Sequence, residues 1–335
     1  MGTSSLSLAE SPTAVVTGGA GFLGSHLCRR LLDKGLQVVA LDDLSTGDVR
    51  NLAELSSHPR FTFRRHDVSQ PYHAPASLIF NFACCASPLH YQADPEHTIR
   101  TCVEGALNAL HLARQRDARM LQASTSEIYG EPEVHPQVES YRGAVSTTGP
   151  RACYDEGKRC AETLCFDAHR KSGTQVKVVR IFNTYGPHMR AGDGRVVSNL
   201  IVQALRGKPM TLHGDGRQTR SFCYVDDLVD GLLRFMDTPA DVCGPINLGN
   251  PHEVSMLELA QRIRRLTGTS SRIVHRPMPV DDPTRRCPDI SLAKSVLDWE
   301  PRVALDDGLR RTITWFQSSM VEERAIAQEA LHVVA

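Results

Sequence analysis

The sequence predicts an α/β protein with a Rossmann-type, doubly wound parallel sheet and a smaller C-terminal lobe suited to substrate binding. Short apolar segments alternate with amphipathic segments of helical length from Thr13 onward. A glycine-rich turn, GGAGFLG, joins the first predicted strand to the first predicted helix. After Gly186 the regular alternation gives way to short mixed segments, which marks the start of the second lobe.

The first strand is expected at 14–17, and the helix that follows, at 25–34, ends before Gly35, a residue that commonly terminates helices. The second strand, at 37–41, ends at Asp42. Further strands are expected at 61–63, 78–81, 120–124 and 176–181, and long helices at 95–116 and 152–171. Repeated strand–helix units favour a parallel sheet with helices on both faces.

Beyond Gly186 we expect helices at 196–206, 226–236 and 257–267, and short strands at 210–212 and 221–224. The predicted domains are a dinucleotide-binding unit over 13–186, with returning segments near 221–250, and a substrate lobe formed by 187–220 and 251–316. The two ends, 1–12 and 320–335, are expected to be flexible or peripheral.

The composition is that of an ordinary globular chain of 335 residues, 41% hydrophobic and 23% charged. Lys and Arg number 38, as do Asp and Glu, so a general attraction to nucleic acid or anionic membranes is not expected. Residues 1–12 lack a signal-peptide pattern, and no apolar run approaches the ~20 residues of a membrane span, so a cytoplasmic location is expected. The ten cysteines lack paired zinc-type spacing, so we expect reduced thiols and no metal.

The glycine-rich turn has the spacing of a phosphate-binding turn. Gly18 permits a tight turn, Gly21 lets the backbone approach a pyrophosphate, and Gly24 lets the helix pack on the strand. Phe22 and Leu23 complete the turn at the start of the helix, where unpaired N–H groups attract an anion. The turn therefore predicts a bound dinucleotide.

An acid at the end of the second strand identifies the dinucleotide. Asp42 has the position at which a carboxylate binds the adenosine ribose, and its charge repels a 2′-phosphate, so NAD is expected rather than NADP. Asp67 and Val68 follow the third strand and are expected to border the adenine. The alternative for Asp67 is a solvated acid at a strand end.

Tyr154 and Lys158 form a Tyr-x-x-x-Lys pair on a predicted helix, where residues four apart share one face. A tyrosine hydroxyl has a pKa of about 10. The lysine and a nicotinamide charge favour the phenolate, which can accept a proton from a sugar hydroxyl as hydride leaves the same carbon. The alternative is an ordinary surface helix.

Polar residues also follow the strand at 120–124. The carboxyl end of a parallel strand is where ligands bind, so Thr125 and Ser126 are expected to orient the reacting oxygen and Glu127 to take part in the chemistry. The alternative is that Ser124 and Thr125 cap a short helix, with Glu127 as its first-turn acid.

These motifs lie in longer stretches where the chain resembles the UDP-glucuronate decarboxylases, or UDP-xylose synthases, of the extended short-chain dehydrogenase/reductase group in the NAD-dependent epimerase/dehydratase family. The resemblance covers about 14–316. Its most specific stretches are ASP at 86–88, QASTSEIYG at 122–130, GPRACYDEGKRCAE at 149–162, RIFNTYGP at 180–187, GRVVSNLIVQAL at 194–205, GDGRQTRSFCYVDD at 214–227 and DDPTRRCPDI at 281–290.

The resemblance implies conversion of UDP-glucuronate to UDP-xylose and carbon dioxide through a transient 4-keto intermediate, with tightly bound NAD⁺ that is regenerated in each cycle. Tyr154 would remove the C4 hydroxyl proton while hydride passes to NAD⁺. The 4-keto group would then let the C5 carboxylate leave as carbon dioxide through an enolate. Protonation of C5 and return of the hydride to C4 would complete the cycle.

Related 4,6-dehydratases carry Asp-Glu where this chain has Ser126-Glu127, and simple 4-epimerases usually lack the glutamate. Arg286 matches the family arginine near the sugar carboxylate, a role that suits bidentate binding. A solvated surface arginine is the alternative. A 4,6-dehydratase, a UDP-glucuronate 4-epimerase and a catalytically silent NAD-binding protein stay as alternatives for the whole chain.

The resemblance also implies how substrate and partner subunit are bound. Five residues match positions around the UDP-sugar: Ser87, Asn183, Asn199, Arg220 and Tyr224. A homodimer through a four-helix bundle is implied, with 95–116 and 152–171 as its helices. Their candidate apolar stripes are Leu107, Leu110 and Ala113 on one helix, and Ala161, Leu164 and Ala168 on the other. Packing inside one subunit explains these stripes equally well.

Three segments depart from the family pattern: 84–85, 141–148 and 186–188, where Gly-Pro-Arg is replaced by Gly-Pro-His. The departure at 141–148 precedes the helix that carries Tyr154, so it leaves the shape of that loop and the sugar preference open.

Overall fold

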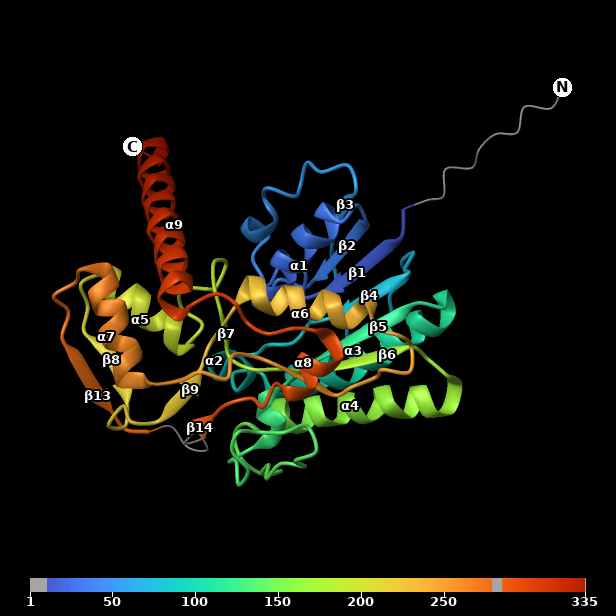
Figure 1. Cartoon of the computed structure of the whole chain (residues 1–335). Coiled ribbons are helices and arrows are strands. Elements are labelled where there is room, and N and C mark those ends of the chain that lie inside the picture. Colours follow the sequence, from blue (N-terminus) through green and yellow to red (C-terminus); the bar gives the residue numbers. More distant parts are fainter. Residues whose placement is uncertain (1–10, 279–284, 335) are drawn as a thin grey trace.

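The computed structural model describes residues 11–278 and 285–334 (Figure 1). Its main sheet has seven strands, all parallel, in the order β11-β6-β5-β4-β1-β2-β3. The predicted Rossmann-type doubly wound sheet is confirmed. The strands are β1 (Thr13–Thr17), β2 (Gln37–Asp42), β3 (Phe61–Arg65), β4 (Leu78–Asn81), β5 (Arg119–Thr125), β6 (Val176–Ile181) and β11 (Ile246–Leu248).

Helices cover both faces of the sheet. Along β1, successive side chains point to opposite faces, so Ala14 and Val16 join one hydrophobic core and Val15 joins the other. The first core is closed by α1 (Phe22–Asp33) and α6 (Val225–Asp237), and the second by α3 (Pro95–Arg116) and α4 (Ala152–Ser172). Because helices pack on both faces of the sheet, every residue of β1 is buried.

The second lobe is built from short strands and helices at one end of the sheet (Figure 1). Strand β8 pairs with β13, β9 lies between β12 and β14, and β7 pairs with β10. The elements are β7 (Thr184–Tyr185), α5 (Val196–Leu205), β8 (Met210–His213), β9 (Thr219–Ser221), β10 (Cys223–Tyr224), β12 (Glu253–Ser255), α7 (Met256–Thr267), β13 (Ile273–Arg276) and β14 (Arg285–Arg286). The division of the chain into two domains stays a prediction.

The remaining elements are η1 (Val49–Leu52), α2 (Pro88–Tyr91), η2 (Ser126–Tyr129), α8 (Ser291–Leu297) and α9 (Leu305–Val334). Helix α9 includes most of the predicted C-terminal tail, whereas residues 1–10 of the N-terminal tail lie outside the described residues. Across 11–278 and 285–334, no helix is both long enough and apolar enough to span a bilayer.

The predicted dimer stripes pack mainly inside the subunit. Leu110, Ala113 and Ala168 belong to the core between α3, α4 and the sheet, and Ala161 is fully buried. Leu164 also packs against that core. The periodicity of these positions is therefore explained by the sheet face that the two helices cover. Leu107 alone of the six is exposed, at 44%.

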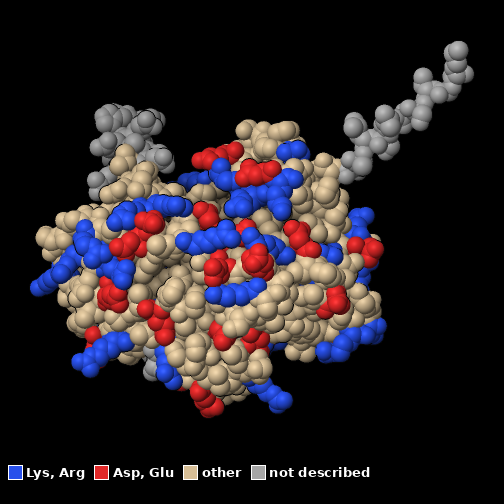
Figure 2. All heavy atoms as spheres, in the orientation of Figure 1, with Lys and Arg blue, Asp and Glu red and all other residues tan. Residues whose placement is uncertain are grey.

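The described surface carries charges of both signs. On the face shown in Figure 2, Lys and Arg side chains are interspersed with Asp and Glu. Many form short-range pairs, such as Arg262 with Glu258 and Asp306. The formal net charge of the chain is zero, and on this face the positive and negative side chains are interspersed rather than gathered into separate patches.

Candidate active site

The glycine-rich turn after β1 requires glycine at two positions. Gly18 has a φ of +68°, and a Cβ there would lie 2.9 Å from the Ala83 backbone nitrogen. A Cβ on Gly24 would lie 2.0 Å from the Gly18 carbonyl oxygen. Helix α1 starts at Phe22, and Gly21, which has no side chain, precedes it as the N-cap. The first N–H groups of α1 are therefore presented to the space above β1, where an anion is favoured.

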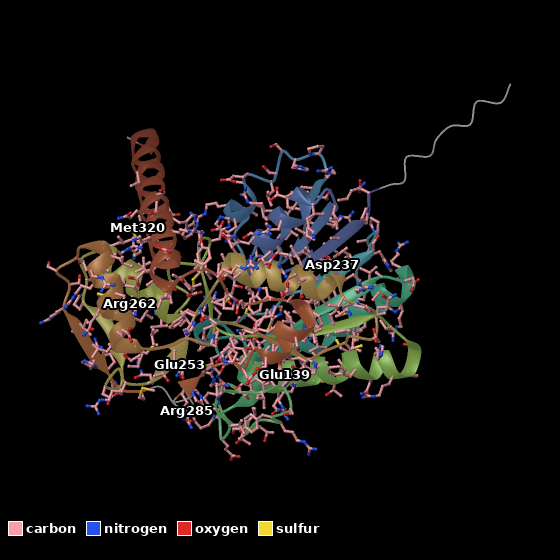
Figure 3. All side chains as sticks on the ribbon, viewed as in Figure 1. Glu139, Asp237, Glu253, Arg262, Arg285 and Met320 are labelled. Carbon is pink, nitrogen blue, oxygen red and sulfur yellow. The ribbon has the colours of Figure 1, made fainter. Side chains whose placement is uncertain are left out.

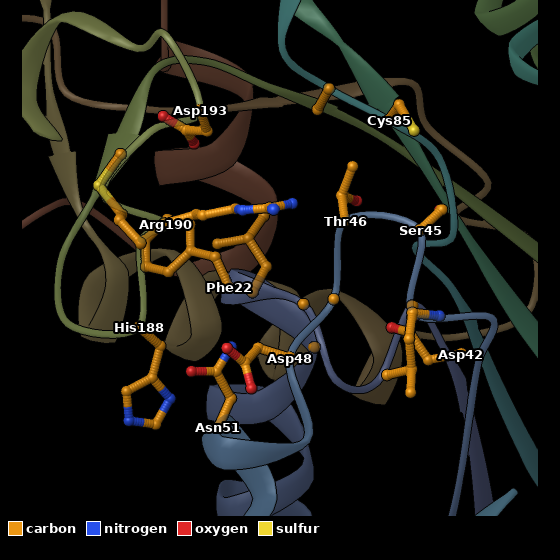
Figure 4. Close-up of a pocket in the computed structure, with 18 of the residues that line it drawn as sticks. Phe22, Asp42, Ser45, Thr46, Asp48, Asn51, Cys85, His188, Arg190 and Asp193 are labelled. Atoms are coloured by element: carbon orange, nitrogen blue, oxygen red, sulfur yellow. The ribbon is translucent and has the colours of Figure 1, made fainter. Parts of the chain in front are cut away.

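A cavity of about 780 Å³ opens at this turn (Figure 4). Its volume lies within the range of small-molecule and cofactor sites. Nine predicted binding residues line it: Gly18, Gly21, Phe22, Leu23, Gly24, Asp42, Asp67, Val68 and Ser87. The cavity lies at the carboxyl ends of β1, β2 and β4, which is the ligand-binding edge of a parallel sheet.

Asp42 is buried and also holds the glycine turn in place. Its Oδ2 accepts a hydrogen bond from the Ala20 N–H at 3.0 Å, and its Oδ1 accepts one from Leu44 at 2.9 Å. Burial raises the pKa of Asp42, against the lowering effect of these N–H donors. The carboxyl thus fixes the end of β2 against the phosphate turn while facing the cavity.

Two loops that sequence reasoning missed complete the cavity. One follows β2 and contributes Ser45, Thr46, Asp48 and Asn51, and Figure 4 shows it beside the start of α1. Asn51 Nδ2 donates to the Ala20 carbonyl at 2.9 Å. The sequence could have identified this loop by its position, because the polar, glycine-containing segment directly follows the strand that ends at Asp42. Ligands bind beside the carboxyl ends of parallel strands.

The second loop, 188–195, carries one of the departures from the family pattern. His188 Nδ1 lies 2.9 Å from Ser25 Oγ on α1. Burial, and then the nearby His26 and Arg29, lower the pKa of His188 to about 4. A neutral imidazole therefore lines the cavity where the family pattern has an arginine, and Arg190 from the same loop also lines it (Figure 4).

The Tyr154–Lys158 pair is buried on α4, with 5% and 4% of each residue exposed. Lys158 Nζ donates to the Ala123 carbonyl of β5 at 3.0 Å and lies 5.8 Å from the centre of the Tyr154 ring. The Tyr154 ring stacks on Tyr91 of α2, with centroids 5.1 Å apart and planes 4° apart. The alternative of an ordinary surface helix is therefore wrong for this face of α4.

Burial raises the pKa of Tyr154 well above its ordinary value, although a hydrogen bond with the Thr125 side chain opposes the shift. The phenolate was expected from the lysine together with a nicotinamide charge, and the raised pKa describes Tyr154 with the lysine alone. Activation of Tyr154 as a base requires a further positive charge close to its hydroxyl.

Thr125 caps a short helix, as the alternative expected, and also contacts Tyr154. Its Oγ1 accepts a hydrogen bond from the Glu127 N–H at 3.2 Å, which caps η2, and its side chain also bonds Tyr154. Ser126 is buried, and its Oγ lies 3.5 Å from Glu127 Oε1. The end of β5 thus places the Thr125 side chain against Tyr154, and the Glu127 carboxylate follows two residues later.

Glu127 is held by two arginines. Its Oε2 accepts a short hydrogen bond from Arg151, the N-cap residue of α4, and lies 3.4 Å from Arg286 Nη2. Burial alone would raise the pKa of Glu127, but the charges of Arg286, Arg151 and Arg220 outweigh it and hold the pKa below its ordinary value. Glu127 is therefore a carboxylate at neutral pH.

Arg286 is 1% exposed, so the surface-charge alternative is wrong. Alternation along β14 turns Arg285 outward, as Figure 3 shows, and Arg286 inward. Arg286 Nη1 donates to the Ser126 carbonyl at 2.7 Å. Its Nε is buried and has no hydrogen-bond partner among the residues that the structure describes. A buried donor of this kind is suited to an incoming acceptor.

Ser124, by contrast, faces a structural network behind the site. Its Oγ donates to Glu162, which also forms a bidentate pair with Arg180 at 3.0 and 2.9 Å. Arg180 Nη1 lies 3.0 Å from the Tyr129 hydroxyl. This buried network ties β5, η2, α4 and β6 together and so holds the strand end that carries Thr125 and Glu127.

The residues expected around the sugar nucleotide are more dispersed. Ser87 is buried and its hydroxyl donates to the Asp193 carbonyl, and Tyr224 packs edge-on against Tyr185 at 5.6 Å. Asn183 and Asn199 are partly buried. None of these except Ser87 lines the 780 Å³ cavity, nor do Glu127, Tyr154, Lys158, Arg220 or Arg286. That cavity therefore corresponds to the dinucleotide part of the predicted site.

The chain matches the family model described as "NAD dependent epimerase/dehydratase family" over residues 14–249. It is 51% identical to UDP-glucuronic acid decarboxylase 1 of Arabidopsis thaliana over 92% of this chain and 71% of that protein. It is 52% identical to UDP-glucuronic acid decarboxylase 6 of the same plant, over 88% of this chain and 86% of that protein.

Solved structures are similar over nearly the whole chain. UDP-glucuronic acid 4-epimerase from Bacillus cereus, in complex with UDP-glucuronic acid and NAD, has a TM-score of 0.81 at 28% identity, covering 91% of this chain and 99% of that one. UDP-glucose 4-epimerase from Thermotoga maritima, with UDP-glucose, has a TM-score of 0.84 at 27% identity, covering 92% and 99%. The chain therefore belongs to the NAD-dependent epimerase/dehydratase family, on its UDP-glucuronic acid decarboxylase branch.

Proposed function

We propose that this chain decarboxylates UDP-glucuronate to UDP-xylose and carbon dioxide. The observation that carries the proposal is the buried guanidinium of Arg286, which lies beside Glu127 and has an Nε without a partner among the described residues. An arginine held in this way suits a substrate that carries a carboxylate. The similarity to UDP-glucuronic acid decarboxylases supports the same substrate.

The cavity at the glycine turn fits NAD. Gly18, Gly21 and Gly24 with the N-terminus of α1 would hold the pyrophosphate, and Asp42 would hold the adenosine ribose. When bound, NAD supplies an acceptor for hydride from C4 of the sugar and a donor that returns it. The close approach of Gly24 to Gly18 leaves no room for a side chain in this turn, as backbone binding of a pyrophosphate requires.

Tyr154 would take the proton of the C4 hydroxyl, with Thr125 bonded to its side chain and Lys158 beside its ring. The resulting C4 ketone lies β to the carboxylate on C5. When the C5–carboxylate bond breaks, its electron pair passes into an enolate and carbon dioxide leaves. A proton then adds to C5, and Tyr154 returns its proton to the C4 oxygen as the hydroxyl is restored.

Two other reactions of the family are alternatives, and the residues at the site argue against only one of them. A 4,6-dehydratase requires an acid to protonate the departing C6 hydroxyl, and this chain has Ser126, a buried hydroxyl with its Oγ 3.5 Å from Glu127. A UDP-glucuronate 4-epimerase acts on the same acid substrate, so Arg286 alone does not distinguish it. The fate of the carboxylate is therefore the decisive measurement.

Incubation of the purified chain with UDP-glucuronate labelled at its carboxyl carbon tests the proposal. We expect labelled carbon dioxide and an equal amount of UDP-xylose, with no net accumulation of NADH. A product of unchanged mass would instead indicate an epimerase. Reaction with only a neutral hexose nucleotide would indicate a dehydratase and contradict the proposal.

A homodimer through α3 and α4 is part of the proposal. Both helices cover one face of the sheet, and the outer side of α3 exposes Leu107 at 44% and Ile99 at 40%. Exposed large apolar residues on a long helix suit a helix–helix interface. Of the six residues predicted to form apolar stripes, only Leu107 supports this interface, and Ile99 was not among them. The cytoplasmic location stays a prediction.

A further inference from the structure

Two cysteine thiols lie in contact where the segment after β4 meets α3. The sulfur atoms of Cys84 and Cys102 are 3.2 Å apart and share a hydrogen bond. All ten cysteines of the sequence lie in the described residues, and all are free thiols. In a disulfide the sulfur atoms are about 2.05 Å apart, so these two need to approach by only roughly 1 Å to form one.

The pair lies directly beside the face of α4 that carries Tyr154 and Lys158. A Cβ added at Gly157 would lie 3.0 Å from the Cys102 Cβ and 3.2 Å from its Sγ, so the missing side chain lets α3 and α4 meet at this point. Burial raises the pKa of Tyr154, and the two thiols add to that rise. A chemical change of the pair therefore occurs next to the proposed proton acceptor.

The two thiols differ in exposure and in how readily they ionise. Cys84 is partly buried and lines the 780 Å³ cavity, whereas Cys102 is 2% exposed. The hydrogen bond with Cys84 lowers the pKa of Cys102, with a further contribution from Lys158 and against the effect of burial. The same hydrogen bond, together with burial, raises the pKa of Cys84. One thiolate is thus favoured in the pair, and the shared hydrogen bond allows the remaining proton to pass between the sulfurs.

We propose that Cys84 and Cys102 form a redox-sensitive dithiol, which a peroxide converts to a disulfide and an added thiol restores. A thiolate is the form of cysteine that attacks an oxidant, and a peroxide that enters the cavity reaches the partly exposed Cys84 before Cys102.

The oxidation balances with hydrogen peroxide as the oxidant. The Cys84 thiolate attacks one peroxide oxygen, the O–O bond breaks, and hydroxide leaves and takes up a proton to become water. The Cys102 sulfur then attacks the sulfenic sulfur of Cys84, and the sulfenic oxygen leaves as a second water. Each sulfur has lost one electron and the peroxide has gained both. A dithiol such as dithiothreitol reverses the change by thiol–disulfide exchange and is itself oxidised.

The disulfide is expected to disturb the dinucleotide cavity. Because Gly157 confines Cys102, much of the approach falls on Cys84. The residue before it, Ala83, donates its N–H to Thr17 Oγ1 at 3.1 Å and lies against Gly18 of the glycine turn. A shift of roughly 1 Å here moves the cavity wall relative to Tyr154, and we expect turnover to fall by about 10–10²-fold. This effect on turnover rests on the proposed function, whereas the pairing of the two sulfurs does not.

The test treats the NAD-loaded protein with hydrogen peroxide, alkylates the remaining thiols and identifies linked tryptic peptides by mass spectrometry without reduction. Cleavage after Arg100 separates the two cysteines, and fragmentation distinguishes Cys84 from its neighbour Cys85. We expect a Cys84–Cys102 linked pair, lighter than the two reduced peptides by two hydrogen atoms. The loss of turnover should develop with this linkage and should be reversed by dithiothreitol.

Cys102→Ser keeps a small hydrogen-bonding side chain but cannot form the linkage. We expect this variant to keep its turnover after peroxide treatment. Cys160→Ser is the matched control, because Cys160 is an exposed cysteine of α4. That variant should keep both the linkage and the sensitivity of the wild type.

Three results would overturn the inference. The first is a wild-type protein in which peroxide oxidises the exposed Cys160 but does not link Cys84 to Cys102, a result that does not depend on any variant folding. The second is a linkage that leaves turnover unchanged, and the third is a loss of turnover that persists in Cys102→Ser. The proposed function fails separately, by the absence of carbon dioxide release from the fully reduced protein, so the two failures are distinguishable.

Discussion

At the scale of single residues, the site is governed by burial and by the charges that offset it. Glu127 and Asp155 are neighbours, yet the pKa of Glu127 is lowered and that of Asp155 is raised to about 7. Two arginines contact Glu127, whereas the arginine nearest to Asp155 is Arg151 at 3.9 Å, and Asp155 Oδ1 has no hydrogen-bond partner within 11–278 and 285–334. The pKa values of two carboxyl groups in one site are thus shifted in opposite directions by different surroundings.

Replacing Tyr154 with phenylalanine removes the hydroxyl that would exchange the C4 proton while keeping the ring stacked on Tyr91. We expect turnover to fall by about 10²–10⁴-fold, the usual contribution of a positioned acid–base group. NAD content and thermal stability should be nearly unchanged. A Tyr154→Phe protein that keeps wild-type turnover would show that another group is the base.

Replacing Arg286 with alanine removes the buried cation beside Glu127. Removal of one partner of a buried ion pair lowers the free energy of unfolding by about 3–5 kcal/mol, so we expect lower stability. We also expect a large loss of UDP-glucuronate affinity, because the cation proposed to bind the carboxylate is gone. UDP-xylose binding, measured on the same folded protein, should be affected far less. Arg286→Lys keeps the charge but not the fork, and should restore only part of the uronate affinity. Equal losses for both ligands would contradict a carboxylate role.

At the scale of elements, sequence patterns predicted the parts whose geometry is local. The glycine turn predicted a helix directly after β1, although α1 begins at Phe22 and not at the predicted position 25. The Tyr-x-x-x-Lys spacing identified a face of α4 that is buried, because it depends on residues within one turn. The Arg151–Glu127 pair joins residues 24 apart and was not predicted, since it depends on how α4 meets η2. Helical periodicity likewise identified the apolar side of α3 but not the sheet against which it packs.

Gly24→Ala tests the turn as an element. A Cβ at this position would lie 2.0 Å from the Gly18 carbonyl, and this backbone atom cannot move without displacing β1 or α1. We expect lost NAD affinity and a stability loss of at least about 1–3 kcal/mol, as for overpacked cores. Gly192→Ala is the control, because Gly192 lines the same cavity and its added Cβ would meet nothing within 4 Å. Normal NAD binding by Gly24→Ala would refute the close-packed turn.

Leu107→Arg tests the outer side of α3 as an interface. Leu107 is 44% exposed, so the change should leave the fold intact but place a charge in the proposed four-helix bundle. We expect the mass measured by analytical ultracentrifugation to fall from a dimer to a monomer. Leu292→Arg, at a 36% exposed position on α8, should remain dimeric. A wild-type monomer, or a dimer unaffected by Leu107→Arg, would exclude this interface.

At the scale of the whole molecule, the sheet order brings four distant segments to one edge. Parallel pairing of β1, β2, β4 and β5 aligns their carboxyl ends, so the glycine turn, Asp42, Cys84 and Thr125 all follow strands of the same sheet. The alternation of strands and helices made this edge predictable from sequence. The loop at 45–51 and the return of β14 beside η2 were not, because the first depends on contacts with the glycine turn and the second on a contact between segments 160 residues apart, rather than on a repeating pattern.

In the proposed reaction, one sugar carbon gives up its hydride and receives the same hydride back after the carboxylate has left. The most direct test uses UDP-glucuronate carrying deuterium at C4, with the products identified by mass and NMR spectroscopy. We expect UDP-xylose that retains deuterium at C4, together with one equivalent of carbon dioxide. UDP-xylose that has lost the deuterium to solvent, or a deuterated product that still carries its carboxylate, would contradict it.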